Sequence, residues 1–304
     1  GRTARSSSSR RSTSRRPAPR TSGSELTGDR RSRILGSASP GAGRGIAVAT
    51  ISTLVVVGLV VLAVVNASGW PDVKQAFFDP DVFSESFPEI ARAFLVNVKI
   101  FLIAEVFILI LALVLAILRG LPGPVFFPLR ALATVYADLF RGVPTVLVIY
   151  ILGFGVTALQ LPGVPVSPLF WGTVALVLVY SAYVSEVYRA GIESVHPSQE
   201  AAARSLGLSR FDALRFVVLP QAVRRVIPPL LNDFIGLQKD TALVALLGVV
   251  EAFRQSQIDV AATFNYTPYI CTAILFVAIT VPLARFTDWL IARDRRRQLA
   301  GGLR

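Results

Sequence analysis

Six long apolar stretches alternate with polar segments along the chain. Each holds about 20 residues or more, the length that an α-helix needs to cross the hydrocarbon core of a bilayer. In chain order the stretches are 46–66, 93–118, 132–158, 168–189, 226–250 and 268–291. The pattern predicts an all-α polytopic membrane protein with about six transmembrane helices.

The third stretch is interrupted by Gly142-Val143-Pro144. Glycine and proline at membrane depth are tolerated where the freed backbone groups find protein or water partners. This break is therefore expected to face the interior of the helix bundle.

The placement of charge predicts the topology. Arginines cluster in 1–45, after the second and fourth stretches, and in 293–304, whereas the segment 67–92 is net acidic. Because cytoplasmic loops of membrane proteins are enriched in Lys and Arg, both termini are expected on the cytoplasmic side. The segment 67–92 is expected to be an extracytoplasmic loop.

The segment 1–45 is rich in Ser, Arg, Gly and Pro, and this composition predicts a disordered cytoplasmic tail. Its arginine pairs leave a twin-arginine export signal and nucleic-acid binding as alternatives. No apolar run directly follows any pair, so the export signal is disfavoured. A basic arm near anionic lipid is the simpler interpretation.

Overall composition agrees with a membrane protein. Hydrophobic residues make up 53% of the chain and charged residues 16%, and the mean hydropathy is +0.59. The net charge of +12 could indicate a nucleic-acid partner, but the clustering of the arginines fits a topology signal and no nucleic-acid partner is expected. With one cysteine and one histidine, no intrachain disulfide can form and no metal site is expected.

Enzyme signatures are absent from the sequence. There is no G-x-x-x-x-G-K-[ST] phosphate loop and no G-x-S-x-G nucleophile elbow. The chain is therefore expected to be neither a P-loop ATPase nor a hydrolase.

The polar segment between the fourth and fifth stretches carries the signals of two short helices. Ser198 can cap a helix that runs to about Leu206, and Gly207 can supply a left-handed stop. Ser209 can cap a second helix that Pro220 would end. Helix, glycine turn and helix would then form one element between two spans.

This element resembles the EAA loop of ABC importer permeases, on Ala201-Ala202-Ala203, Gly207 and Val217-Val218-Leu219-Pro220. Other matches point to the subfamily that carries polar amino acids. They are Ser181-Ala182-Tyr183, Arg189-Ala190-Gly191, Pro220-Gln221-Ala222, Pro228-Pro229, Lys239-Asp240-Thr241 and Phe140-Arg141-Gly142-Val143-Pro144. The resemblance covers roughly residues 88–295.

One position departs from the family pattern. The family glutamate falls on Ala201, and the nearest acid, Glu200, lies one residue earlier, which rotates the carboxylate by about 100° on a helix. The resemblance implies a cytoplasmic coupling loop at 191–222 that docks on an ATPase subunit; a surface hairpin without a partner is the alternative. The expected coupling residues are Ser198, Glu200, Ala201, Ala202, Gly207, Leu208, Phe211, Leu219 and Pro220.

The resemblance also implies the rest of the assembly. Residues 93–292 would form a five-helix permease core, and 46–66 an additional N-terminal helix, in the plasma (inner) membrane of a prokaryote. The implied partners are ABC ATPase subunits, a second permease copy or paralogue, and an extracytoplasmic substrate-binding protein. ATP and magnesium would bind to the ATPase, with no cofactor in this chain, and the cargo would be a polar amino acid such as glutamate, glutamine or arginine.

Polar residues inside the apolar stretches are candidates for a translocation pathway, because an ionisable group at bilayer depth costs about 2.5–3.5 kcal/mol on insertion scales. On the fifth stretch Asn232 and Lys239 share one stripe, and Asp233, Gly236 and Asp240 form the adjacent one. The candidates are Asp138, Arg141, Asn232, Lys239, Asp240 and Thr241. Alternatively, the charged members neutralise one another and hold the helices together.

Glu186 and Arg189 lie three positions apart near the end of the fourth stretch, where they can form an ion pair. It could change during gating or be purely structural.

Two other function classes remain open at this stage. A self-sufficient, ion-coupled secondary carrier would typically show two related halves, and the sequence shows no internal repeat. A membrane anchor or sensor would leave the polar stripes of the fifth stretch unexplained.

Overall fold

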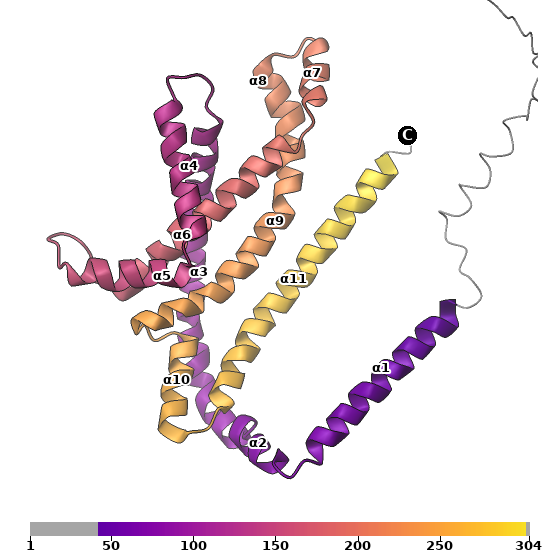
Figure 1. Ribbon diagram of the computed structural model, residues 1–304, viewed down its shortest axis with the longest axis vertical. Coiled ribbons are helices and arrows are strands. Elements are labelled where there is room, and N and C mark those ends of the chain that lie inside the picture. The colour runs from indigo at the N-terminus through magenta and orange to yellow at the C-terminus, as the bar shows by residue number, and fades with distance from the viewer. Residues whose placement is uncertain (1–41, 302–304) are drawn as a thin grey trace, which may run out of the picture. The chain divides into compact units, whose positions relative to one another are not determined.

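The computed structural model describes residues 42–301, and within these residues all regular structure is helical (Figure 1). The chain divides into two units, Gly1–Trp70 and Pro71–Arg304, which are described separately below. Disorder was predicted for the segment 1–45. Residues 1–41 of this segment lie outside the described part of the chain.

The first unit contains one described helix, α1 (Ala42–Val65). It confirms the helix predicted over 46–66. Its apolar side chains, such as Leu54 and Leu59, are exposed along its length. A helix that is apolar all round is suited to lipid.

The second unit begins with a short helix, α2 (Trp70–Phe77), and a long one, α3 (Pro80–Gly120). Most of the segment 67–92, predicted to be an extracytoplasmic loop, is helical. Asp79 caps α3 by accepting the N–H groups of Asp81 and Val82, and Pro80 suits the first helical position. The early turns are then held by apolar packing of Ile90 and its neighbours against Ala252 and Cys271.

The next segment is sharply bent. Helix α4 (Phe127–Gly142) is followed by α5 (Thr145–Tyr150) and the π-helical turn η1 (Ile151–Val156), and the two parts meet at 104°. Val143 at the bend is extended (φ −94°, ψ 132°), as expected before a proline. The predicted break at Gly142-Val143-Pro144 is confirmed.

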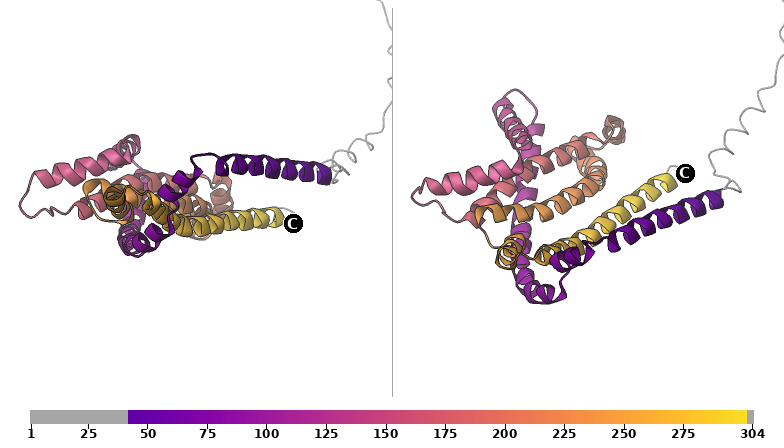
Figure 2. Two further views of the ribbon diagram at one scale, coloured as in Figure 1. Left: turned by 90° about the horizontal axis from the view of Figure 1, so that it is seen from below. Right: turned by 60° about the horizontal axis from the view of Figure 1, so that its bottom comes forward.

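Helix α6 (Pro168–Glu193) packs against α3, α4 and α9 (Leu219–Asp240). Figure 2 shows α6 and α9 running side by side from two directions of view. Their close approach is evident at Gly191, where an added Cβ would collide with the Val226 side chain. Small residues at this crossing let the two backbones come together.

The segment predicted as a span over 226–250 is not one continuous α-helix. Helix α9 ends at Asp240, the 3₁₀-helix η3 runs over Thr241–Leu247, and Gly248 closes the segment with φ +82°. Two further helices complete the chain, α10 (Ala252–Thr263) and α11 (Thr267–Gly301). The residues 293–301, predicted to belong to a tail, continue α11, and 302–304 lie outside the described residues.

Among the described residues, four helical segments are long and apolar enough to cross a membrane, and a fifth is obtained if the bent pair counts as one span. The four are Ala47–Val65, Trp70–Gly120, Pro168–Glu193 and Thr267–Arg293, and the bent pair is Phe127–Gly142 with Thr145–Val156. The all-α membrane fold is confirmed. The predicted span at 226–250 is not among these segments, because α9 carries five charged residues: Arg224, Arg225, Asp233, Lys239 and Asp240.

Candidate functional site

The polar segment between α6 and α9 forms a hairpin of two short helices, labelled α7 and α8 in Figure 1. Helix α7 is Pro197–Ser205, α8 is Arg210–Ala213, and the π-helical turn η2 (Leu214–Val218) leads into α9. Residues 194–218 are called the α7–α8 hairpin below.

The first cap differs from the prediction. The N-cap of α7 is His196, whose Nδ1 accepts the Ser198 N–H at 3.2 Å, so Ser198 lies inside the first turn. Pro197 suits this first turn because its missing N–H would have been unsatisfied there. Gly207 has φ +91° and ends the α7 turn as predicted, while Leu208 N donates back to Ala203 O at 3.3 Å.

The second cap agrees with the prediction. Ser209 Oγ accepts the Asp212 N–H at 3.1 Å and donates to the Asp212 carboxylate at 2.6 Å. Pro220, however, does not end the helix: it lies in the first turn of α9, directly after η2. The wider π turn accommodates a proline that cannot donate an i→i−4 hydrogen bond, so the backbone stays helical from 210 to 240.

The α7–α8 hairpin buries small side chains and exposes large ones. Ala203, Ala213 and Val218 are buried. In contrast, Leu206 is 86% and Phe211 66% exposed. Large apolar side chains presented together on a polar loop are typical of a protein interaction surface.

The other predicted coupling residues surround this surface. Ala201, Ala202, Leu219 and Pro220 are exposed, and Leu208 is half-buried. Glu200 approaches Arg210 at 3.9 Å, and both side chains are largely exposed, so this ion pair contributes little to stability.

A second polar feature lies where the ends of α3, α4 and α6 meet. The Glu186 carboxylate pairs with Arg119, with Arg141 at 3.4 Å, and with Arg189 at 2.8 Å. Arg189 also pairs with Glu193 at 2.7 Å. The predicted Glu186–Arg189 pair is confirmed, and it is one edge of a group that joins three helices; these five residues are called the Glu186 cluster.

A third polar feature is a buried core between α3, η3 and the start of α10. Asn97 Nδ2 donates to Glu251 Oε2 at 2.7 Å and to Thr241 Oγ1 at 3.2 Å, while its Oδ1 accepts the Ala252 N–H at 3.1 Å. Glu251 is also the N-cap of α10, accepting the N–H groups of Phe253 and Arg254. Burial raises the pKa of the Glu251 carboxyl, which lies outside the membrane-length helices, and these hydrogen bonds oppose that shift.

Asp240 lies next to this core and is held by α6. The Tyr180 hydroxyl donates to Asp240 Oδ2 at 2.9 Å, and the Tyr180 ring passes over Gly236. One turn earlier, Asp233 Oδ2 is buried without a hydrogen-bond partner among the described residues. The stripe Asp233, Gly236 and Asp240 therefore faces α6.

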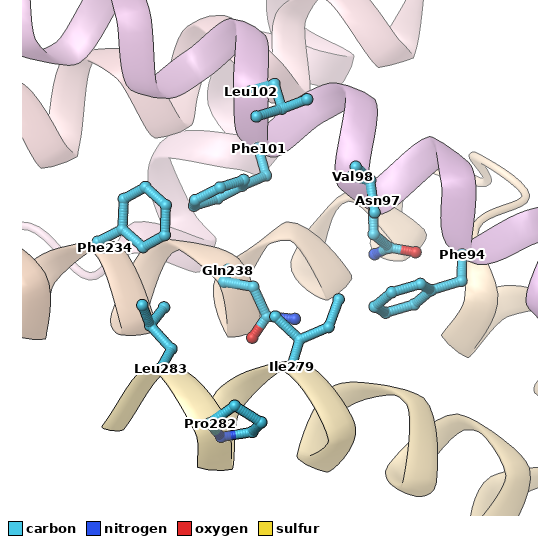
Figure 3. Close-up of a pocket in the computed structure, with 10 residues that line it drawn as sticks. All are labelled: Phe94, Asn97, Val98, Phe101, Leu102, Phe234, Gln238, Ile279, Pro282 and Leu283. Atoms are coloured by element: carbon cyan, nitrogen blue, oxygen red, sulfur yellow. The ribbon is translucent and has the colours of Figure 1, made fainter. Parts of the chain in front are cut away.

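An apolar cavity of about 390 Å³ lies between α3, α9 and α11 (Figure 3). Phe101 and Phe234 meet edge to face at its wall, with ring centroids 4.3 Å apart. Its polar lining residues are Asn97 and Gln238, and Thr280 donates to Gln238 Oε1 at 2.9 Å. None of the six predicted pathway residues lines this cavity.

The structure divides the predicted pathway residues into three groups. Arg141 belongs to the Glu186 cluster, and Asp240 and Thr241 belong to the buried polar region around Asn97. The others are exposed on the surface of this chain: Asp138, Asn232 and Lys239. Arg141 pairs with Glu186, an acid outside the predicted set.

Sequence reasoning missed several partners. Glu251 is fully buried, and Glu251, Tyr180 and Arg119 are absent from the residues predicted for the site. A glutamate directly before a new helix is a capping signal, and it could have marked Glu251. The pairing of Arg119 with Glu186 has no local signal, because the two residues are 67 positions apart.

Comparison with known proteins identifies the family. Residues 109–296 match the family described as binding-protein-dependent transport system inner membrane component. The chain belongs to this family. The predicted resemblance to ABC importer permeases is confirmed.

Similar proteins within this family carry amino-acid permease names. The chain is 32% identical over 204 residues to the probable amino-acid permease YxeN of Bacillus subtilis, covering 67% of this chain and 90% of that one. It is also 32% identical over 214 residues to the arginine transport system permease ArtQ of the same organism, covering 69% and 95%.

Solved structures agree. The fold matches a crystal structure of an amino acid ABC transporter with histidines at a TM-score of 0.62 and 29% identity, covering 68% of this chain and 94% of that one. A methionine ABC transporter in an inward-facing conformation matches in fold, with a TM-score of 0.53 at 15% identity.

Proposed function

We propose that this permease is the membrane subunit of an ABC importer for polar amino acids. Family membership supports an importer over a self-sufficient secondary carrier. The amino-acid cargo rests on the names of the relatives, several of which are glutamine or arginine permeases.

The observation that carries the proposal is the surface of the α7–α8 hairpin. Leu206, Phe211 and Phe216 are exposed on a loop that joins two packed helices, α6 and α9. An ATPase subunit that buries these side chains would acquire a rigid connection to the bundle. In this proposal ATP and magnesium bind to the ATPase, and this chain performs no ATP chemistry.

Movement of the hairpin would reach the bundle through α6 and α9. These helices pack closely where Gly191 meets Val226. ATP-driven closure of the ATPases would therefore shift both helices together, a rigid-body transition between packed states. The residues proposed to meet the cargo are Asp240 and Thr241 beside Tyr180, with Asp138, Arg141, Asn232 and Lys239 on surfaces that a second permease copy would complete.

The remaining partners and the topology follow from the same proposal. A substrate-binding protein would dock on the side opposite the α7–α8 hairpin, and arginine placement puts the hairpin and both termini in the cytoplasm of a prokaryotic cell. The protein would thus be a multi-pass component of the inner membrane.

The test is co-purification of this chain in detergent with its cognate ATPase subunit, followed by ATP turnover with and without an amino-acid-loaded binding protein. We expect stable association and stimulated turnover. Phe211→Ser should weaken association, whereas Phe264→Ser, which changes an even more exposed phenylalanine at the end of α10, should not. Association that survives Phe211→Ser together with Leu206→Ser would remove the hairpin from the interface.

A secondary carrier would behave differently. The chain alone, reconstituted in liposomes, would then move an amino acid under an ion gradient without any ATPase. That result would replace the importer proposal.

A further inference from the structure

A second cavity lies beside the Glu186 cluster, where the end of α3, the start of α4 and the end of α6 meet. Its volume is about 610 Å³, within the range of small-molecule sites. The charged residues that line it are Arg119, Arg130, Arg189 and Glu193. Three guanidinium groups thus face one carboxylate.

Arg130 differs from the other two arginines. Arg119 and Arg189 pair with carboxylates, but Arg130 Nη1 donates to two backbone carbonyls, Leu121 O at 2.8 Å and Gly123 O at 3.0 Å. These neutral partners fix the guanidinium without cancelling its charge. Among the residues whose side chains the structure describes, no carboxylate lies at ion-pair distance from Arg130, so most of its five N–H donors remain available to an anion.

Exposed apolar side chains adjoin the charged cavity. Val125, 82% exposed, and Phe126 precede α4, and Phe127, 64% exposed, begins that helix and lines the cavity with Val135. Apolar and aromatic side chains next to arginines are typical of protein segments at the boundary between lipid tails and headgroups. A soluble anion would gain nothing from these apolar groups, whereas a lipid would contact both.

We propose that this cavity binds the phosphate of an anionic phospholipid, with Arg130 as its principal ligand. Arg130 presents a planar fork that matches phosphate oxygens, and Arg119 and Arg189, which also line the cavity, are held by Glu186 and Glu193. The acyl chains would lie along Phe127 and Val135. Basic pockets between transmembrane helices are suited to such headgroups.

The site depends neither on the cargo nor on which leaflet faces the cytoplasm. Its failure would therefore leave the importer proposal untouched.

The test is native mass spectrometry of the full chain, purified in detergent and titrated separately with phosphatidylglycerol and with phosphatidylcholine. We expect phosphatidylglycerol to be retained at least tenfold more strongly than phosphatidylcholine. Inorganic phosphate and glycerophosphoglycerol, added as competitors, distinguish a lipid site from a site for a soluble anion.

Variants test the named residues in both directions. Arg130→Gln should weaken retention of phosphatidylglycerol about fivefold, as expected for the loss of one arginine near a phosphate. Glu193→Gln should strengthen it, because it removes the carboxylate that lines the cavity and one of the two acids paired with Arg189. The matched control is Arg210→Gln, since Arg210 is an exposed arginine of the α7–α8 hairpin, and lipid retention should not change.

Three results would overturn the proposal: equal retention of the two lipids, unchanged retention by both Arg130→Gln and Glu193→Gln, or displacement of the lipid by millimolar inorganic phosphate. If Arg130→Gln does not elute as a single species, Glu193→Gln alone tests the proposal, because it is predicted to increase lipid retention and misfolding would not produce an increase.

Discussion

The Asn97 side chain donates a hydrogen bond of 2.7 Å to the Glu251 carboxylate across 154 positions of sequence, and both side chains are buried. The same amide bonds Thr241 Oγ1 and the Ala252 N–H. One side chain on α3 therefore forms hydrogen bonds with residues at the start of η3 and at the start of α10.

The first prediction concerns this amide. Asn97→Leu keeps the branching of the side chain at Cγ but removes every one of these hydrogen bonds, leaving a buried N–H and a less satisfied carboxylate. We expect a loss of about 2–4 kcal/mol in stability. The buried Cys271, the single cysteine of the chain, supplies the measurement, because it should react with a thiol-specific fluorophore only on unfolding.

The control is the same substitution at Asn232, which is exposed on α9. Its unfolding temperature should match that of the parent protein. If Asn97→Leu and Asn232→Leu unfold together, the Asn97 hydrogen bonds do not stabilise the fold.

The second prediction concerns the Glu186 cluster. Glu186→Gln leaves Arg119, Arg141 and Arg189 close together without their shared carboxylate. Because the Glu186 and Arg119 side chains are 17% and 13% exposed, we expect a loss of about 2–4 kcal/mol, somewhat less than for a fully buried pair. The Cys271 labelling assay measures it.

Glu193→Gln provides the comparison. Its side chain is 61% exposed and its pairing with Arg189 should be worth less than about 1 kcal/mol. Equal losses in the two variants would mean that the cluster acts as separate surface pairs.

The third prediction concerns the turn of the α7–α8 hairpin. Gly207 has φ +91°, so Gly207→Val strains the backbone by about 1–2 kcal/mol and misaligns the two short helices. We expect transport to be uncoupled from ATP hydrolysis. Uptake and ATP turnover measured on the same proteoliposomes report this.

Gly207→Asn is the matched variant, because asparagine tolerates left-handed backbone better than valine does. It should retain more coupling. Normal uptake by a well-expressed Gly207→Val protein would show that the turn does not transmit movement.

The fourth prediction concerns the crossing of α6 and α9. Gly191→Ala should destabilise the protein, since the new Cβ collides with the Val226 side chain. The double variant Gly191→Ala with Val226→Ala should recover part of the loss, because the second change makes room. A double variant less stable than either single variant would contradict a steric crossing.

Local patterns in the sequence predicted much of the α7–α8 hairpin. The glycine at 207 and the serine at 209 could be assigned because a left-handed stop and a side-chain cap each depend on neighbouring residues. The Ser198 cap was wrong because helix α7 begins earlier: His196, a less common capping residue, accepts the N–H of Ser198 itself. Pro220 was misassigned because a preceding π turn can absorb its missing donor.

By itself, the sequence determined the membrane-helical class, the bend at Pro144, the hairpin between α6 and α9, and the family, because these depend on composition and short-range order. Tertiary structure alone decided that Glu186 joins three helices, that Glu251 is buried against Asn97, and that 226–250 is divided between two helix types. Those outcomes arise from contacts between residues tens to hundreds of positions apart, where packing and hydrogen-bond satisfaction override local hydropathy.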